Sequence, residues 1–174
     1  MRACLLSFSV LVLLLAAAPA SAQQAPSRDQ VRALLTGFET VPDDATWQRM
    51  GDAALLHLVA LYDDGSQPAY VRLRAVGAAG AFPVPASRTF LMAVAQTPRQ
   101  SDLLVREAVR ALGRGFGRRV EGELTSFLTH DSPLVREVAA QALGRSHIGG
   151  DALRARLESE RNAEVRAAIQ TALR

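Results

Sequence analysis

The chain of 174 residues carries twenty basic residues, all of them arginine, and seventeen acidic residues, for a formal net charge of +3. Its single cysteine is Cys4, so the rest of the chain has no thiol for a disulfide, a thiolate metal site or a cysteine nucleophile. The length is typical of one domain, and packing alone must hold its fold.

The first 22 residues have the features of a signal peptide. Arg2 supplies the positive start, an apolar run follows from Leu5 to Leu15, and Ala20-Ser21-Ala22 fits the cleavage pattern. The run is short for a membrane-spanning helix, although an uncleaved anchor stays open as the alternative. We therefore expect a mature chain that starts at Gln23, is periplasmic or secreted, and does not span a membrane.

A short polar linker then leads into the first expected helix. Its apolar residues have the spacing of one helical face: Val31, Leu34, Leu35 and Phe38. This segment has no counterpart downstream, and we interpret residues 23–45 as a linker and an N-terminal capping helix for residues 46–174. Thr46 is expected to cap one further helix that ends near 63–66 and carries Trp47, Met50, Ala54, Leu58 and Leu61.

The remaining apolar patterns also have a helical period, and none alternates as a strand would. They predict helices at 69–81, 87–95, 102–112, 120–128 and 133–143, a short helix after Gly149-Gly150, and a last helix that Asn162 caps. Gly113, Gly115 and Gly117 are expected in a turn, because glycine tolerates the left-handed conformation at helix ends. No strand precedes these glycines, which disfavours a phosphate-binding loop.

One motif recurs along these helices. Leu134-Val135-Arg136-Glu137, followed by Ala142-Leu143-Gly144-Arg145, has a close copy at residues 104–114 and weaker copies at 70–80 and 164–174. The arginines at 72, 106, 136 and 166 are separated by 34, 30 and 30 residues. A fixed period of this size is typical of stacked helical units, because one unit cannot bury its apolar face alone. Recurring small residues would let the second helices of neighbouring units approach closely: Ala108, Ala111, Ala139, Ala142, Ala168 and Ala172.

The order of an acidic residue or Asn, Val-Arg, alanines and Leu-Gly resembles HEAT-like repeats of the short bacterial type, over about residues 46–174. The resemblance implies an all-α, right-handed α-solenoid of about four stacked helix pairs behind the capping helix. It also implies an inter-repeat ladder, in which the Val-Arg arginines pair with acids at the repeat junctions. Its members would be Arg106, Arg136 and Arg166 with Asp102 and Asp131, and Asp63 or Asp64 as a further acid.

No pattern of catalytic or metal-ligating residues stands out. His57, His130 and His147 have no regular spacing, and they lack the His-Glu pairs of the di-iron hydroxylases that share the HEAT-like fold. No serine lies in a Gly-x-Ser-x-Gly motif, although a triad that assembles only in space stays open. We expect no enzyme activity, no cofactor and no metal.

The expected function is protein–protein interaction, as a scaffold or adaptor, through the concave face that the second helices line. Polar residues expected to face outward from these helices are the candidate partner contacts: Glu107, Arg110, Arg114, Gln141 and Gln170. One alternative is a structural subunit that self-associates through the last repeat, with Leu157, Ile169 and Leu173. Another is binding of an anionic polymer to residues 66–174, which hold sixteen arginines and ten acidic residues. Export disfavours nucleic acid as that polymer.

Overall fold

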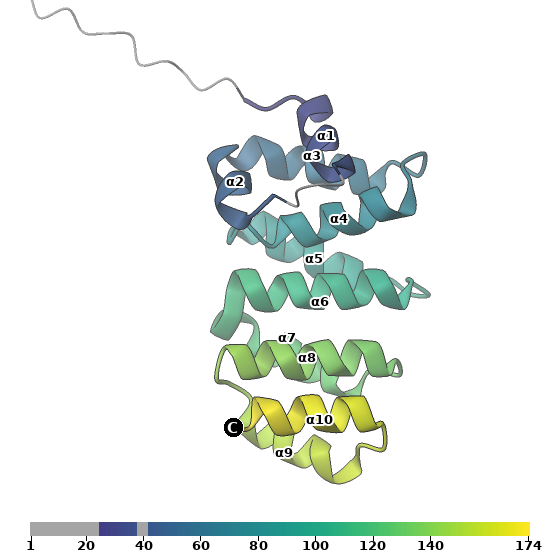
Figure 1. Cartoon of the computed structure of the whole chain (residues 1–174), viewed down its shortest axis with the longest axis vertical. Helices are drawn as coiled ribbons and strands as arrows, with labels where there is room; N and C mark the ends of the chain where they lie inside the picture. Colours follow the sequence, from purple (N-terminus) through teal and green to yellow (C-terminus); the bar gives the residue numbers. More distant parts are fainter. Residues whose placement is uncertain (1–24, 38–41) are drawn as a thin grey trace, which may run out of the picture.

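The computed structural model describes residues 25–37 and 42–174, so the expected signal peptide and Phe38 lie outside the described residues. The described part of the chain is helical throughout, with no strand (Figure 1). Two short 3-10 segments, η1 (Gly117–Val120) and η2 (Phe127–Thr129), flank α7. The α-helices are α1 (Arg28–Thr36), α2 (Asp44–Arg49), α3 (Asp52–Asp63), α4 (Ala69–Ala79), α5 (Pro85–Gln96), α6 (Asp102–Phe116), α7 (Glu121–Ser126), α8 (Pro133–Arg145), α9 (Gly150–Ser159) and α10 (Ala163–Ala172).

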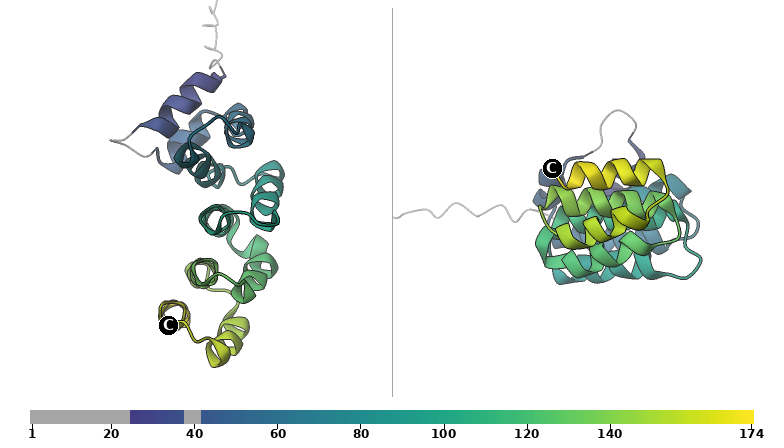
Figure 2. Two further views of the ribbon diagram at one scale, coloured as in Figure 1. Left: turned by 90° about the vertical axis from the view of Figure 1, so that its right-hand side faces the viewer. Right: turned by 90° about the horizontal axis from the view of Figure 1, so that it is seen from below.

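These helices form a stack of antiparallel pairs, which confirms the predicted α-solenoid. The pairs are α3 with α4, α5 with α6, α7 with α8, and α9 with α10. The second helices contact one another in series, α4 with α6, α6 with α8 and α8 with α10. Figure 2 (left) shows two columns that follow a shallow curve, with α4, α6, α8 and α10 on its inner side. Helix α1 packs against α3 and α4.

Two expected boundaries were wrong. The single helix expected after Thr46 is two helices, because Gly51 adopts a positive φ of 73° between α2 and α3. Its cap is Asp43, whose carboxylate accepts a hydrogen bond from the Thr46 backbone N–H at 2.8 Å. Helix α6 continues to Phe116, so Gly113 and Gly115 lie inside it rather than in a turn.

The glycine of each Leu-Gly or Ala-Gly pair contacts the motif alanine of the next repeat. Three such contacts follow one another along the stack: Gly80 with Ala111, Gly113 with Ala142, and Gly144 with Ala172. A Cβ atom added to Gly113 would lie 2.5 Å from the Ala142 Cβ, and one added to Gly144 would lie 2.6 Å from the Ala172 Cβ. Real carbon atoms do not approach so closely, so the expected close approach of the second helices is confirmed at these alanines.

Three of the four Val-Arg arginines, Arg72, Arg136 and Arg166, bind backbone carbonyl groups at or just after the end of the preceding helix. Arg72 Nε donates to the Tyr62 carbonyl oxygen at 2.8 Å. Arg166 Nη1 donates to the carbonyl oxygens of Leu157 and Glu160, both at 2.9 Å. The last carbonyls of a helix lack intrahelical partners and carry partial negative charge, so a guanidinium group satisfies both needs.

The expected acidic ladder therefore differs from the contacts observed. Arg136 Nη1 binds the carbonyl oxygens of His130 and Asp131, at 2.8 and 2.7 Å, and not the Asp131 carboxylate. Among the described residues, the carboxylates of Asp102 and Asp131 form no ion pair with a Val-Arg arginine. Asp64 pairs with Arg28, at 2.6 Å.

A buried acid, Glu160, does join the last two repeats. Its side chain is 1% exposed and accepts hydrogen bonds from Arg136 Nε and Nη2, at 2.8 and 3.0 Å. Arg156 Nη2 lies 2.6 Å away, and the backbone N–H groups of Arg161 and Asn162 also donate to it. These bonds, those from Arg136 first, hold the pKa of Glu160 well below its usual range.

His130 takes the place of Glu160 at the preceding junction. Each residue gives its carbonyl oxygen to the Val-Arg arginine six positions on, and each side chain accepts from a backbone N–H two positions on. Because His130 Nδ1 accepts from Ser132, the neutral ring carries its proton on Nε2 and has no acceptor left. The counterpart of Arg136 at this junction is Arg106, whose buried Nε has no hydrogen-bond partner in the described chain.

Replacing Gly113 by Ala is expected to lower the free energy of unfolding by about 1–3 kcal/mol, because the new methyl group overlaps Ala142. Gly122→Ala is the matched control, since an added Cβ there has no atom within 4 Å. That helical control is expected to be neutral or stabilising by up to about 1 kcal/mol. Urea unfolding measures the free energy of unfolding of both variants. Equal changes for Gly113→Ala and Gly122→Ala would contradict the close contact between Gly113 and Ala142.

Replacing His130 by Glu is expected to raise the free energy of unfolding by about 1 kcal/mol, because a carboxylate gives Arg106 Nε an acceptor. The same substitution in an Arg106→Leu background is the control, since the gain must vanish without the guanidinium group. Thermal and urea unfolding of the wild type, His130→Glu, Arg106→Leu and the double variant measure the coupling energy between the two positions. A gain that persists when Arg106 is absent would refute the pairing.

Replacing Glu160 by Gln is expected to cost about 3 kcal/mol at neutral pH, because Arg136 is left buried without a counter-charge. The folded pKa of Glu160 is depressed, so its stabilisation is complete above the unfolded pKa of about 4.3 and is lost as the pH falls towards the folded pKa. The difference in unfolding free energy between the wild type and Glu160→Gln should therefore become smaller below about pH 4. Urea unfolding across pH tests this, and a constant gap would count against it.

Candidate functional site

The inner face of the stack is built by the helical period of the second helices. Helix α6 buries one side, which includes Val105, Ala108, Val109 and Leu112. Its opposite side presents Glu107, Arg110 and Arg114. Helices α8 and α10 follow α6 along the inner side of the curve (Figure 2). On this side α8 carries Glu137, Gln141 and Arg145, and α10 carries Glu164 and Thr171.

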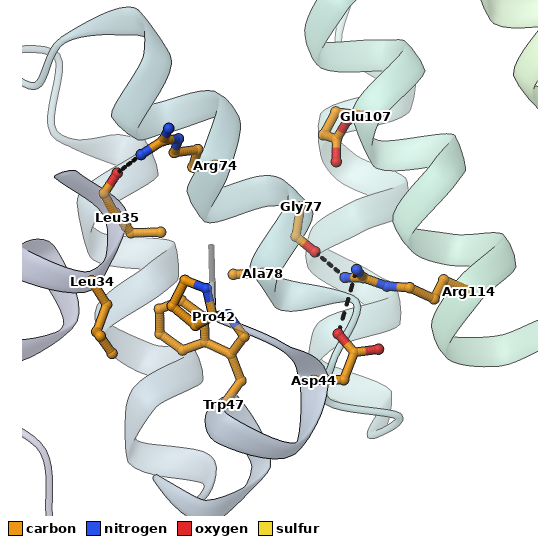
Figure 3. Close-up of a pocket in the computed structure, with 10 residues that line it drawn as sticks. All are labelled: Leu34, Leu35, Pro42, Asp44, Trp47, Arg74, Gly77, Ala78, Glu107 and Arg114. Carbon is orange, nitrogen blue, oxygen red and sulfur yellow. Dashed lines mark hydrogen bonds and ion pairs between the residues drawn. The ribbon is translucent and has the colours of Figure 1, made fainter. Parts of the chain in front are cut away.

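Three guanidinium groups gather towards the C-terminal ends of α6 and α8. Arg110 Nη1 donates to Glu107 at 2.6 Å. Arg114 Nη2 donates to the Gly77 carbonyl oxygen at 2.6 Å, and its Nη1 lies 3.4 Å from Asp44 Oδ1 (Figure 3). Arg145 forms no hydrogen bond or ion pair with any described residue. Helix α6 packs against α8, with Gly113 facing Ala142, so Arg114 and Arg145 lie on adjoining parts of the two helices. Burial, and then the positive charges of Arg110 and Arg114, lower the pKa of Arg145. We name Arg110, Arg114 and Arg145 the basic edge.

Carboxylates lie nearer the N-terminal ends of the same helices. Glu107, Glu137 and Glu164 come from α6, α8 and α10, and we name them the acidic edge. Glu137 accepts a hydrogen bond from Gln141 Nε2 at 2.9 Å, and Glu164 lies in the first turn of α10. Of the residues of the two edges, Glu164 lies in the first turn of its helix and Arg114 and Arg145 lie in the last turns of theirs, where each interacts favourably with the helix dipole. The inner face thus has two edges of opposite charge.

An open groove of about 640 Å³ runs between α8 and α10. Its floor consists of small residues: Gly144, Ala167, Ala168 and Ala172. Its rims carry Glu137, Gln141 and Glu164 towards one end and Arg145 towards the other. Because the floor lacks long side chains, a side chain of another molecule can reach the helix backbones. The arrangement suits recognition by shape and charge.

A smaller cavity of about 140 Å³ lies where α1 and α2 meet α4 and α6 (Figure 3). Buried Trp47 and Leu35 form part of its apolar wall. Its polar groups are already engaged, since Arg74 Nη1 donates to the carbonyl oxygens of Leu35 and Gly37, at 2.8 and 2.7 Å. Arg114 lines this cavity and also belongs to the basic edge, so the cavity adjoins the inner face towards the N-terminal end of the stack.

The structure brings most of the predicted contact residues together, with exceptions on α10 and α8. Glu107, Arg114 and Gln141 line cavities of the inner face, and Arg110 adjoins them through Glu107. Gln170 is exposed but does not line the groove, because α10 turns Glu164, Ala168 and Thr171 towards it. Ala140, which follows Arg110 by one 30-residue period, is fully buried.

Two further sequence interpretations need revision. Ile169, expected at a self-associating end, is fully buried, because it packs into the core between the last helices. Leu157 and Leu173 are partly buried against that core. Arg145 was missed as a contact residue, although it matches Arg114 in the repeated Ala-Leu-Gly-Arg motif. This match in the repeated motif could have identified Arg145 from the sequence.

Within residues 25–37 and 42–174, no three His, Cys, Asp or Glu side chains are grouped so that they could hold a metal ion. The ring nitrogens of two histidines contact the backbone: His57 Nε2 lies 3.0 Å from the Pro26 carbonyl oxygen, and His130 Nδ1 accepts from Ser132. In the same part of the chain, none of the helices combines the length and the apolar character that crossing a membrane requires.

Comparison with known proteins relates part of the chain to a family. Residues 99–174, which contain α6 to α10, match the family model of HEAT repeats. No curated protein matches the chain. HEAT repeats generally mediate contacts between proteins, and their all-helical fold is typically non-catalytic. The stacked helix pairs and the family match over residues 99–174 together support a HEAT-like repeat protein.

Proposed function

We propose that the chain is an exported, non-enzymatic scaffold or adaptor that binds another protein on its inner face. The observation that carries this proposal is the open groove between α8 and α10, with its floor of small residues and its charged rims. Stacked repeats present extended curved surfaces of this kind, and partners bind along them.

The outer side of the stack offers a less suitable surface. A groove there is lined by Pro83, Phe116 and Met92, but its charged residues already have partners. Arg88 forms an ion pair with Glu123, and the Arg119 guanidinium lies 5.1 Å from the centre of the Phe116 ring. A partner would have to displace these contacts, whereas Arg145 on the inner face is free of described ones.

The export part of the proposal rests on the first 22 residues, with their apolar run and Ala20-Ser21-Ala22. The chain after Cys4 has no cysteine, so folding in an oxidising compartment needs no disulfide and risks no wrong one. The proposed location is the periplasm or the extracellular space. N-terminal sequencing of the protein from its native source should begin at Gln23.

Site-specific photo-crosslinking tests the proposed face. A crosslinking amino acid at Ala167, which is exposed and lines the groove, is expected to capture a discrete partner protein in native extract. The same amino acid at Gln170, which is exposed on the same helix but outside the groove, is the matched control and should not. Ala167→Arg fills the groove and should abolish binding of the captured partner, whereas Gln170→Arg should leave it intact. Equal capture from both positions, or capture from neither, would overturn the proposal.

A further inference from the structure

The basic edge has more positive charge than its described surroundings neutralise. Arg110 is paired with Glu107, and Arg114 is paired with the Gly77 carbonyl oxygen and, at 3.4 Å, with Asp44. Arg145 adds a third guanidinium group with no described partner. Like charges held close together raise the energy of the free protein, so a carboxylate placed among them relieves repulsion and gains attraction.

The guanidinium groups are also accessible to another molecule. The side chains of Arg110 and Arg114 are 42% and 45% exposed, and Arg145 lies on the rim of the open groove. Guanidinium presents a planar fork of N–H donors that matches the two oxygens of a carboxylate. Three such forks from two adjacent helices can hold more than one carboxylate along the axis of the stack.

We propose that the basic edge, Arg110, Arg114 and Arg145, docks the carboxylates of an acidic segment of a partner protein that lies along the inner face. This inference rests on the proposed function and names the chemistry of the partner. The Ala- and Gly-lined floor between α8 and α10 receives the neighbouring side chains of the same segment.

The acidic edge favours a protein segment over an anionic polymer. Glu137 precedes Arg145 by eight residues on α8, which is about 12 Å along the helix. On α6, Glu107 is already paired with Arg110, so carboxylates lie close to the basic edge on both helices. A uniformly anionic polymer that reached the basic edge would also meet Glu137 and Glu164. A peptide can place carboxylates over the arginines and neutral or basic residues over the glutamates.

Selection from a displayed library of random dodecapeptides tests the proposal with a defined probe. Peptides selected on the mature chain are expected to be enriched in Asp and Glu, and their affinity should fall as salt rises. Arg145→Ala should weaken the selected peptides about tenfold, because it removes a charged hydrogen-bonding partner. Arg145→Lys should weaken them less, since the charge stays while the planar fork is lost. Arg161→Ala, which removes an exposed arginine outside the inner face, is the control and should have no effect.

Other outcomes separate this inference from the proposed function. If the selected peptides are not enriched in acidic residues but Ala167→Arg still blocks their binding, the role of the basic edge is overturned. The inner face then remains the binding site. Selected peptides that Ala167→Arg does not affect, or the absence of any enriched peptide, would count against both. Polyphosphate that binds the basic edge more tightly than the selected peptides would overturn the protein segment as the occupant.

Discussion

The spacing between neighbouring second helices is the constraint on which the rest of this structure depends. It is set where a glycine of one repeat faces an alanine of the next, three times in succession from Gly80 to Ala172. A single added methyl group at Gly113 or Gly144 would overlap the facing alanine. Because α6, α8 and α10 lie this close, their outward side chains form one surface rather than separate helix faces. The inner groove and its charged edges follow from that contact.

Within three of the helix pairs, the motif arginine of the second helix binds carbonyl oxygens at or just after the end of the first helix. A helix terminus always offers such oxygens, so these contacts need no particular acid. Between repeats, Glu160 provides a buried carboxylate for Arg136 at one junction, and His130 replaces it at the preceding one. The charge pairing is therefore uneven along the stack, and Arg106 Nε has no hydrogen-bond partner in the described chain.

The repeated motif was enough to predict the stacked helix pairs, the capping by Asn162 and the role of the small residues. Helical periodicity reports which side of a helix is apolar, and that information placed Glu107, Arg114 and Gln141 on the inner face. It does not report backbone acceptors, because every residue has a carbonyl group. The acidic ladder was therefore expected where carbonyls bind instead.

The other errors have similar causes. A glycine is typical both of a turn and of a close contact between two helices. For Gly113 the sequence does not distinguish the two, whereas its contact with Ala142 in the structure does. Ile169 was expected at an exposed end but is buried, because the rotation of α10 against α8 is a property of packing. The same rotation leaves Gln170 exposed but outside the groove. Arg145 was missed because its position near Arg110 and Arg114 depends on how α6 packs against α8, which the sequence does not report.

Hydrogen–deuterium exchange of the mature chain, free and bound to a partner or selected peptide, tests protein binding at the inner face without any substitution. Binding there is expected to slow exchange in α8 and α10, and in the C-terminal half of α6. Slower exchange confined to α5, α7 and α9, on the outer side of the stack, would contradict it.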